Sequence, residues 1–123
     1  MNLDQFVVGV VDDDPRVLES IEELLVSSGY TVLPFPSAES FLDANGFQRV
    51  QCLISDIGMP VMSGWDLLDI ARAQSSPVPV ILITARDEEV LDTTMAARGA
   101  RHLFRKPFDG RELLAALDSV LRP

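Results

Sequence analysis

The sequence predicts an α/β domain in which a parallel β-sheet is covered by helices on both faces. Short apolar runs of strand length alternate with helical patterns from one end of the chain to the other. The clearest run, residues 6–11, is apolar throughout, as is typical of a strand buried on both faces of a sheet. The 123 residues have the length of one ordinary domain, and 47% of them are hydrophobic, which excludes a disordered tail.

Five strands are expected, and the positions directly after them are where function is predicted. The expected strands are residues 6–11, 30–33, 50–55, 78–84 and 102–105. No repeat, low-complexity segment or internal linker interrupts this order, so residues 1–123 are expected to form a single domain. In a parallel sheet of this kind, functional groups collect beyond the carboxyl ends of the central strands.

The first three of five expected helices lie between these strands. Asp14 and Pro15 open the first helix, because a capping carboxylate followed by proline is typical of a helix start. Ser37 has a side chain suited to cap the second helix. The third helix is expected over residues 65–73, after a loop at residues 58–64.

The last two helices differ in the strength of their pattern. Residues 87–98 are rich in short and polar residues, so the fourth helix is weakly patterned and fits a mobile element. Asp109 and Glu112 have the spacing of a capping box for the fifth helix. Its apolar stripe consists of Leu113, Leu114, Leu117, Val120 and Leu121.

Charge and composition exclude several classes of function. The formal net charge is −9, so a nucleic-acid backbone would repel the domain, and direct nucleic-acid binding is not expected. The longest apolar stretch, residues 78–83, is broken by Pro79 and is too short to span a membrane. The N-terminus has no basic region and no cleavage site of a secretory signal. Since the single cysteine, Cys52, also fits a reducing cytosol, we expect a cytoplasmic protein in which this thiol is buried and inert.

Polar residues stand at the ends of four expected strands. They are Asp12 and Asp13 after the first strand, Asp56 after the third, Thr84 at the end of the fourth and Lys106 after the fifth. If the first strand lies centrally, all these ends converge on one edge of the sheet. That edge would hold three carboxylates, one hydroxyl and one ammonium group.

This set of groups suits phosphoryl transfer. Clustered carboxylates repel one another and need a cation among them, and hard oxygen ligands suit Mg²⁺ or Mn²⁺. A metal ion and an ammonium group neutralise charge on an incoming phosphoryl group. One carboxylate is then left to act as a nucleophile and form an acyl phosphate.

Five stretches of the chain carry a family pattern. They are VVDDDPRVLESIEELL, SAESFL, ISDIGMPVMSGWDLL, PVILITA and LFRKPFDGRELL. Together they resemble the receiver domain of two-component response regulators, in the correct order and spacing over nearly the whole chain. They are most similar to the FixJ-type regulators. The resemblance implies a doubly wound, flavodoxin-like αβα sandwich of three layers, with five helices and a five-stranded parallel sheet in the order 2-1-3-4-5.

The resemblance also implies a phosphoacceptor and a metal site. Asp56 matches the residue that receives the phosphoryl group. Asp12 and Asp13 match the acidic pair that binds Mg²⁺ together with Asp56. Gly58 matches the position that offers the metal its backbone carbonyl, a role that does not depend on a side chain.

Two further residues match the switch of the family, and one position departs from it. Thr84 matches the hydroxyl that moves toward the phosphoryl group, and Lys106 matches the lysine that contacts this group. The peptide between Lys106 and Pro107 is expected to be cis. Where the family often has an aromatic switch residue, this chain has Leu103, with Phe104 next to it and expected to face the core.

For several residues, a structural or surface role is considered beside a functional one. Arg86 lies where relatives tune the lifetime of the phosphoryl group, and its side chain either shields the acyl phosphate or points to solvent. Asp14 is expected to cap a helix rather than bind metal. His102 is expected to be a surface residue, without a role as a phosphoacceptor.

Two other functions remain open at this point. A phosphatase that passes through an aspartyl phosphate would use an Asp-x-Asp motif, and Asp12 and Asp14 have that spacing, although the chain lacks a cap domain over a substrate. A degenerate receiver would keep the fold and signal by protein contact alone. The complete set of strand-end residues argues against it.

The resemblance implies partners as well. A sensor histidine kinase would donate the phosphoryl group, and phosphorylation would bias a two-state equilibrium of the surface formed by the fourth helix, fifth strand and fifth helix. The FixJ-like character implies a DNA-binding output domain beyond this chain, which would then be the amino-terminal part of a longer regulator. Homodimerisation on phosphorylation is a further expectation from the family.

Overall fold

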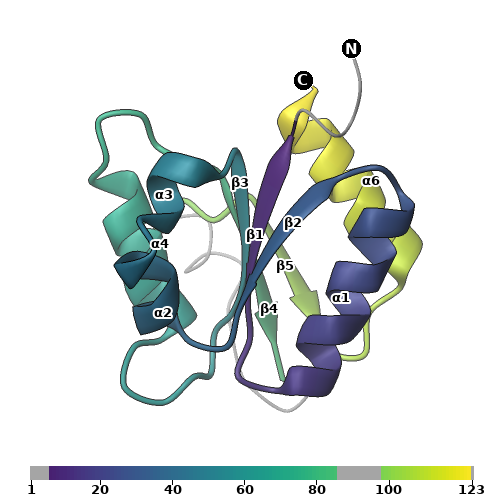
Figure 1. Cartoon of the computed structure of the whole chain (residues 1–123), viewed down its shortest axis with the longest axis horizontal. Helices are drawn as coiled ribbons and strands as arrows, with labels where there is room; N and C mark the ends of the chain where they lie inside the picture. Colours follow the sequence, from purple (N-terminus) through teal and green to yellow (C-terminus); the bar gives the residue numbers. More distant parts are fainter. Residues whose placement is uncertain (1–5, 86–97, 123) are drawn as a thin grey trace.

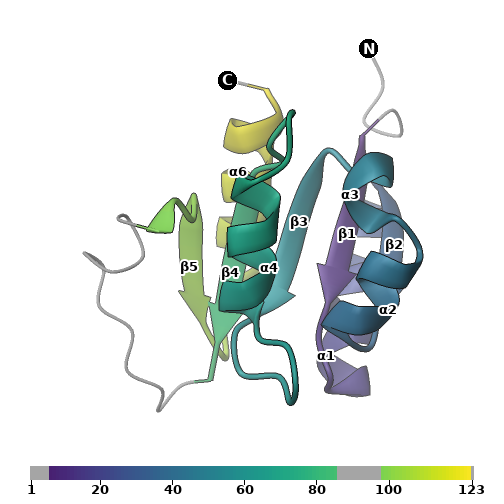
Figure 2. The same cartoon turned by 90° about the vertical axis from the view of Figure 1, so that its left-hand side faces the viewer.

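The strands form one parallel sheet in the order that the resemblance implies. The computed structural model describes residues 6–85 and 98–122. Its five parallel strands lie in the order β2-β1-β3-β4-β5 (Figure 1). Their bounds are β1 Val7–Val11, β2 Thr31–Phe35, β3 Cys52–Asp56, β4 Val80–Thr84 and β5 His102–Arg105. All carboxyl ends therefore meet at one end of the molecule, beside the loop that follows β3 (Figure 2).

Helices cover both faces of the sheet and give the expected three layers. The described helices are α1 Pro15–Ser27, α2 Ala38–Asp43, α3 Gly46–Arg49, α4 Gly64–Arg72 and α6 Gly110–Leu121. One face is covered by α1 and α6, and the other by α2, α3 and α4 (Figure 1). Except for Arg98, the helix predicted over residues 87–98 lies outside the described residues. Among the helices that the structure describes, none combines the length and apolarity that a membrane crossing requires.

Two apolar clusters fill the spaces between the sheet and the helical layers. The cluster under α2, α3 and α4 is built around Phe41, whose ring packs edge-to-face against Phe35 and Phe47 at centroid distances of 5.4 and 4.9 Å. The cluster under α1 and α6 contains Ile21 and Leu25 of α1. All residues of β3 and β4 are buried between the helical layers. Truncating a core ring such as that of Phe41 to alanine should cost about 3–5 kcal/mol.

Two helices begin with an aspartate cap. Asp14 caps α1, and its side chain accepts a hydrogen bond from the Arg16 N–H at 2.9 Å, which confirms the predicted cap. Asp109 caps α6 in the same way, through the Arg111 N–H at 2.8 Å. The predicted capping box with Glu112 is wrong, because the aspartate bonds the residue two positions on instead of three.

Several predicted boundaries differ from the structure. β2 runs to Phe35 instead of covering residues 30–33, and it includes Pro34, which an edge strand tolerates because one of its sides has no ladder partner. The short helix α3 was not expected; it follows Asn45, whose φ of 56° is left-handed. β4 begins at Val80, two residues later than predicted.

Candidate functional site

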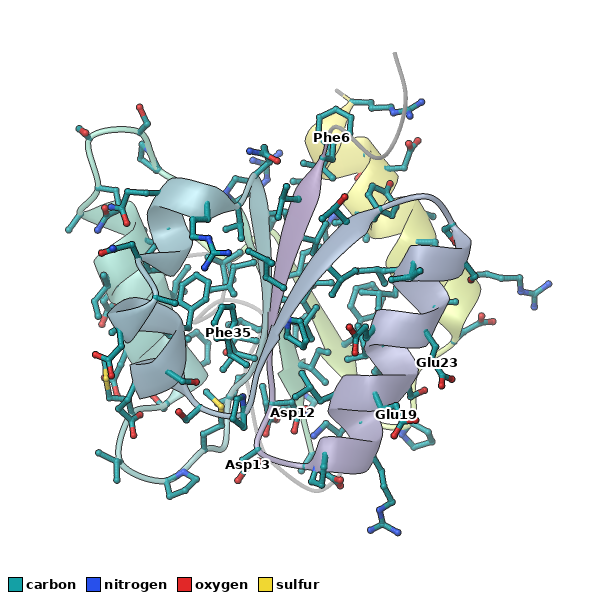
Figure 3. All side chains as sticks on the ribbon, in the orientation of Figure 1. Phe6, Asp12, Asp13, Glu19, Glu23 and Phe35 are labelled. Atoms are coloured by element: carbon teal, nitrogen blue, oxygen red, sulfur yellow. The ribbon has the colours of Figure 1, made fainter. Side chains whose placement is uncertain are left out.

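Three aspartates meet at the carboxyl end of the sheet. Asp12 directly follows β1, and Asp56 is the last residue of β3, so these paired strands place both residues at the same end. Asp13 comes next to Asp12, and Figure 3 shows both beside the end of β1 where the chain turns toward α1. Carboxylate oxygens of the three residues all lie within 4.8 Å of one another. The structure thus brings together the three carboxylates that the sequence pattern placed at strand ends.

The ends of β4 and β5 add a hydroxyl and a cation to this cluster. Lys106 directly follows β5, and its Nζ lies 3.1 Å from Asp12 Oδ2 and 3.5 Å from Asp56 Oδ1. Thr84 ends β4 and is fully buried. The Lys106 backbone N–H donates to the Thr84 carbonyl at 2.9 Å, which ties the end of β5 to that of β4. The peptide between Lys106 and Pro107 is cis, as expected.

Burial separates two of the aspartates from the third. Asp12 is 1% exposed and Asp56 is 5% exposed, whereas Asp13 is exposed. Burial raises the pKa of Asp12, against the lowering effects of the Asp14 N–H and of Lys106. The pKa of Asp56 is also raised, first by burial and then by the neighbouring Asp12. Burial lowers the pKa of Lys106, but the two facing carboxylates outweigh this effect and raise it overall.

The oxygen atoms of the cluster fit a divalent cation. Asp12 Oδ1 accepts the Asp14 N–H at 2.9 Å. Its other oxygen, Oδ2, is buried and has no hydrogen-bond partner among the described residues, so its contact with Lys106 is an ion pair without aligned hydrogen-bond geometry. The cluster holds three carboxylates and only one ammonium group contacts it, which leaves excess negative charge for a hard cation such as Mg²⁺. The backbone N–H of Gly58 opposes the rise in the pKa of Asp56, and the role of the Gly58 carbonyl as a metal ligand remains a prediction.

Asp14, which follows Asp12 and Asp13 in the chain, does not join the acidic cluster. The Asp14 carboxylate bonds the Arg16 N–H at the start of α1, and the acidic cluster found in the described residues comprises Asp12, Asp13 and Asp56 only. The paired arrangement of Asp12 and Asp14 that a phosphatase would use is therefore not formed.

Residues of β5 alternate between the two faces of the sheet. Leu103 packs against the cluster under α2, α3 and α4, and Phe104 packs against the cluster under α1 and α6, as expected for Phe104. His102 is the first residue of β5, as the predicted strand has it, and it is half-buried instead of fully at the surface; its ring stacks on that of Phe104 at a centroid distance of 6.2 Å. Cys52 is fully buried, as predicted, and burial raises the pKa of its thiol to about 12, which disfavours the reactive thiolate. Arg86 lies outside the described residues.

The sequence pattern missed one buried polar residue at this end of the sheet. Ser55 directly precedes Asp56, is 0% exposed, and donates from its hydroxyl to the Asp56 carbonyl oxygen at 3.0 Å. The available signal was a hydroxyl in an otherwise apolar strand, next to the expected phosphoacceptor.

Comparison with known proteins identifies the family. Residues 8–118 match the family described as response regulator receiver domain. The chain belongs to this family. It is a FixJ-like receiver domain of a two-component response regulator, and its sheet order is the one that the resemblance implied.

The receiver has relatives of known name and structure. It is 35% identical over 113 residues to the transcriptional regulatory protein FixJ of Bradyrhizobium diazoefficiens, covering 92% of this chain and 55% of that protein. It is 35% identical over 122 residues to the response regulator protein TmoT of Ectopseudomonas mendocina, covering 99% and 56%. Full-length FixJ from B. japonicum has a TM-score of 0.85 at 34% identity, covering 96% of this chain and 58% of that one. The chain spans about half the length of the curated relatives it matches.

Proposed function

We propose that this receiver accepts a phosphoryl group on Asp56, from a sensor histidine kinase or a small acyl phosphate, and relays the signal to an output domain. The observation that carries the proposal is the buried Asp56 carboxylate, within reach of the Lys106 ammonium and of a second buried carboxylate, Asp12. An arrangement of this kind attracts a cation and a phosphoryl group and has no evident use in packing.

In the proposed reaction, an Asp56 carboxylate oxygen attacks the phosphorus atom. A new O–P bond forms while the bond from phosphorus to the donor's imidazole nitrogen or acyl oxygen breaks, and the electron pair of that bond leaves with the donor. Asp12, Asp13, Asp56 and the Gly58 carbonyl would hold Mg²⁺, or Mn²⁺ in its place. The ion, when bound, neutralises charge on the phosphoryl oxygens. The receiver catalyses its own phosphorylation and dephosphorylation only.

Lys106 and Thr84 have separate roles in this proposal. Lys106 already lies at ion-pair distance from Asp56, so its ammonium group can follow the negative charge as it moves onto the phosphoryl oxygens. The Thr84 hydroxyl donates a hydrogen bond to a phosphoryl oxygen once one is present. Because β4 and β5 are paired at this end, movement of Thr84 would be passed to β5. The signal would then reach the surface predicted for the fourth helix, fifth strand and fifth helix.

The output is proposed to be transcriptional. The FixJ relatives are named as transcriptional regulators, and the chain covers about half of their length, so a DNA-binding domain would follow in the longer protein. With a net charge of −9, the receiver itself would not bind DNA. We place the protein in the cytoplasm and expect phosphorylation to favour a homodimer. A phosphorylated receiver that stays monomeric at high concentration in light scattering would count against the dimer.

Intact-mass spectrometry tests the proposal directly. Wild type is incubated with acetyl phosphate, with and without Mg²⁺, beside Asp56→Asn and the capping variant Asp14→Asn. We expect wild type and Asp14→Asn to gain one phosphoryl group, only with the metal, and Asp56→Asn to gain none. If folded wild type gains nothing under any condition, the proposal is wrong and the chain is a degenerate receiver.

A further inference from the structure

One buried polar residue has no part in the proposed reaction. The buried polar or charged side chains of the described residues are those of Asp12, Ser55, Asp56 and Thr84, and all four lie at the carboxyl ends of the central strands. Three of them act in the proposed phosphoryl transfer. Ser55 is the fourth, and a hydroxyl group is costly to bury beside apolar side chains unless it is hydrogen-bonded.

The Ser55 side chain acts on the backbone of Asp56. Side chains alternate along a strand, and the neighbours of Ser55 at two-residue spacing, Leu53 and Ile57, both belong to the cluster under α2, α3 and α4. Ser55 therefore faces that layer, while the Asp56 carboxylate lies in the acidic cluster. Its Oγ donates to the Asp56 carbonyl oxygen at 3.0 Å, so the hydroxyl is satisfied by the peptide that follows the phosphoacceptor.

The start of α4 closes on the same carbonyl from another side. A Cβ atom on Gly64 would collide with the Asp56 carbonyl oxygen and lie 2.9 Å from Ile57 Cα, so only glycine allows this approach. Gly64 also donates its N–H to the Ile57 carbonyl at 3.0 Å. This contact is fixed by a capping box in which Ser63 and Asp66 each bond the other's backbone N–H.

The residues that follow Asp56 in the loop are also fixed by backbone hydrogen bonds. Ile57 donates its N–H to the Ile83 carbonyl at 2.8 Å, and its own carbonyl also accepts the Met59 N–H at 3.1 Å. Between these anchors lies Gly58, whose backbone N–H lies near enough to the Asp56 carboxylate to oppose the rise of its pKa. A rotation of the peptide between Asp56 and Ile57 would therefore move the Gly58 N–H away from the carboxylate.

We propose that Ser55 is a positioning residue for phosphoryl transfer, which holds the peptide after Asp56 so that the Gly58 backbone and the Asp56 carboxylate keep their reactive geometry. The inference rests on the proposed function and deepens it. The competing interpretation is that Ser55 merely satisfies its own hydroxyl with the nearest carbonyl. In that case its loss would change stability and leave the reaction as it was.

The test compares two substitutions that each remove one buried atom from β3. Ser55→Ala removes the hydroxyl that bonds Asp56, and Cys52→Ala removes a fully buried sulfur atom at the other end of the strand. Phosphorylation by acetyl phosphate is followed at increasing donor concentration and saturating Mg²⁺. We expect Ser55→Ala to lower the maximal rate by about tenfold through misplacement of the reacting groups, with a smaller change in half-saturation. Cys52→Ala should keep the wild-type rate, and Ser55→Thr should restore it because threonine keeps the hydroxyl.

A second measurement does not depend on activity or on the fit of threonine. The amide resonance of Gly58 is recorded by NMR in metal-free wild type and both alanine variants. It should shift in Ser55→Ala and stay in place in Cys52→Ala. An unchanged rate and resonance in Ser55→Ala, or equal losses in both alanine variants, would overturn the inference. If wild type is never phosphorylated, the proposed function fails, and the Gly58 resonance alone then decides whether Ser55 positions this backbone.

Discussion

Aspartates at the helix starts differ from those at the strand ends in what they do for the fold. Asp14 and Asp109 each cap a helix through the N–H of an arginine two residues on, at 2.9 and 2.8 Å. Their carboxylates stay in contact with water, at 40% and 42% side-chain exposure, and hydrogen bonding to Arg111 lowers the pKa of Asp109. These residues gain hydrogen bonds on folding while their carboxylates stay partly hydrated.

The strand-end aspartates Asp12 and Asp56 are buried, and their charged carboxylates lose hydration on folding. Asp12 and Asp56 are buried together with one ammonium group between them, and burial raises the pKa of both. Asp12 and Asp14 are two residues apart in the chain, yet burial raises the pKa of Asp12, whereas Asp14 caps a helix. The comparison teaches that solvent contact and hydrogen-bond partners decide whether an aspartate supports the fold or serves the chemistry.

The largest expected effect is the loss of phosphorylation rate when the charge of Lys106 is removed. Removing its charge in Lys106→Met should slow phosphorylation by about 100-fold, because no other described cation lies at ion-pair distance from Asp56. The matched control is Arg111→Met, which removes the cation beside the capping Asp109 and should leave the rate unchanged. Rates come from intact mass against time. Equal rates in both variants would contradict the role of Lys106.

Neutralising a strand-end aspartate should stabilise the metal-free protein. Asp56→Asn should raise the melting temperature at neutral pH by about 4 °C, equivalent to about 1 kcal/mol for a domain of this size. The folded-state pKa of Asp56 is raised, so the folded protein binds this proton more readily than the unfolded chain does, and the cost of the carboxylate is present above that pKa. As the pH falls through the raised pKa, wild type becomes protonated and the advantage of the variant should shrink.

Calorimetry or circular dichroism over a pH series measures this difference. The account fails here if Asp56→Asn melts below wild type at neutral pH without metal. It also fails if the difference between the two proteins stays constant as the pH is lowered.

Loss of a helix cap should lower the stability of the protein, by an amount comparable to or smaller than the gain expected for Asp56→Asn. Asp14→Ala removes the acceptor of the Arg16 N–H and should lower the free energy of unfolding by about 1 kcal/mol. Asp14→Asn keeps a capping oxygen and should stay close to wild type. Urea unfolding measures both variants. If Asp14→Ala were more stable than wild type, the carboxylate of Asp14 would oppose folding, which would contradict its assignment as a stabilising cap.

The sequence alone predicted the acidic edge because its residues stand at the ends of the expected strands. The ends of buried parallel strands converge whatever the details of the loops, so Asp12, Asp56 and Lys106 could be placed together before any coordinates. Asp14 could be assigned as a cap because Pro15 follows it. These inferences depend only on local pattern and on the alternation of strands and helices.

Other features depend on contacts between distant parts of the chain. The meaning of Ser55 depends on the approach of Gly64 to the next carbonyl, which strand periodicity does not encode. The extent of β2 was missed because the edge strand is half exposed and contains Pro34. The helix after Asn45 depends on the left-handed backbone of that residue, which the hydrophobic pattern of the sequence does not predict.

Titration of Mg²⁺ by isothermal calorimetry tests most directly the claim that the buried strand-end carboxylates form the functional site. The account predicts that wild type and Asp14→Asn bind one Mg²⁺ with equal affinity, and that Asp12→Asn binds at least about tenfold more weakly. Equal affinity in all three proteins, or loss of binding in Asp14→Asn alone, would contradict it.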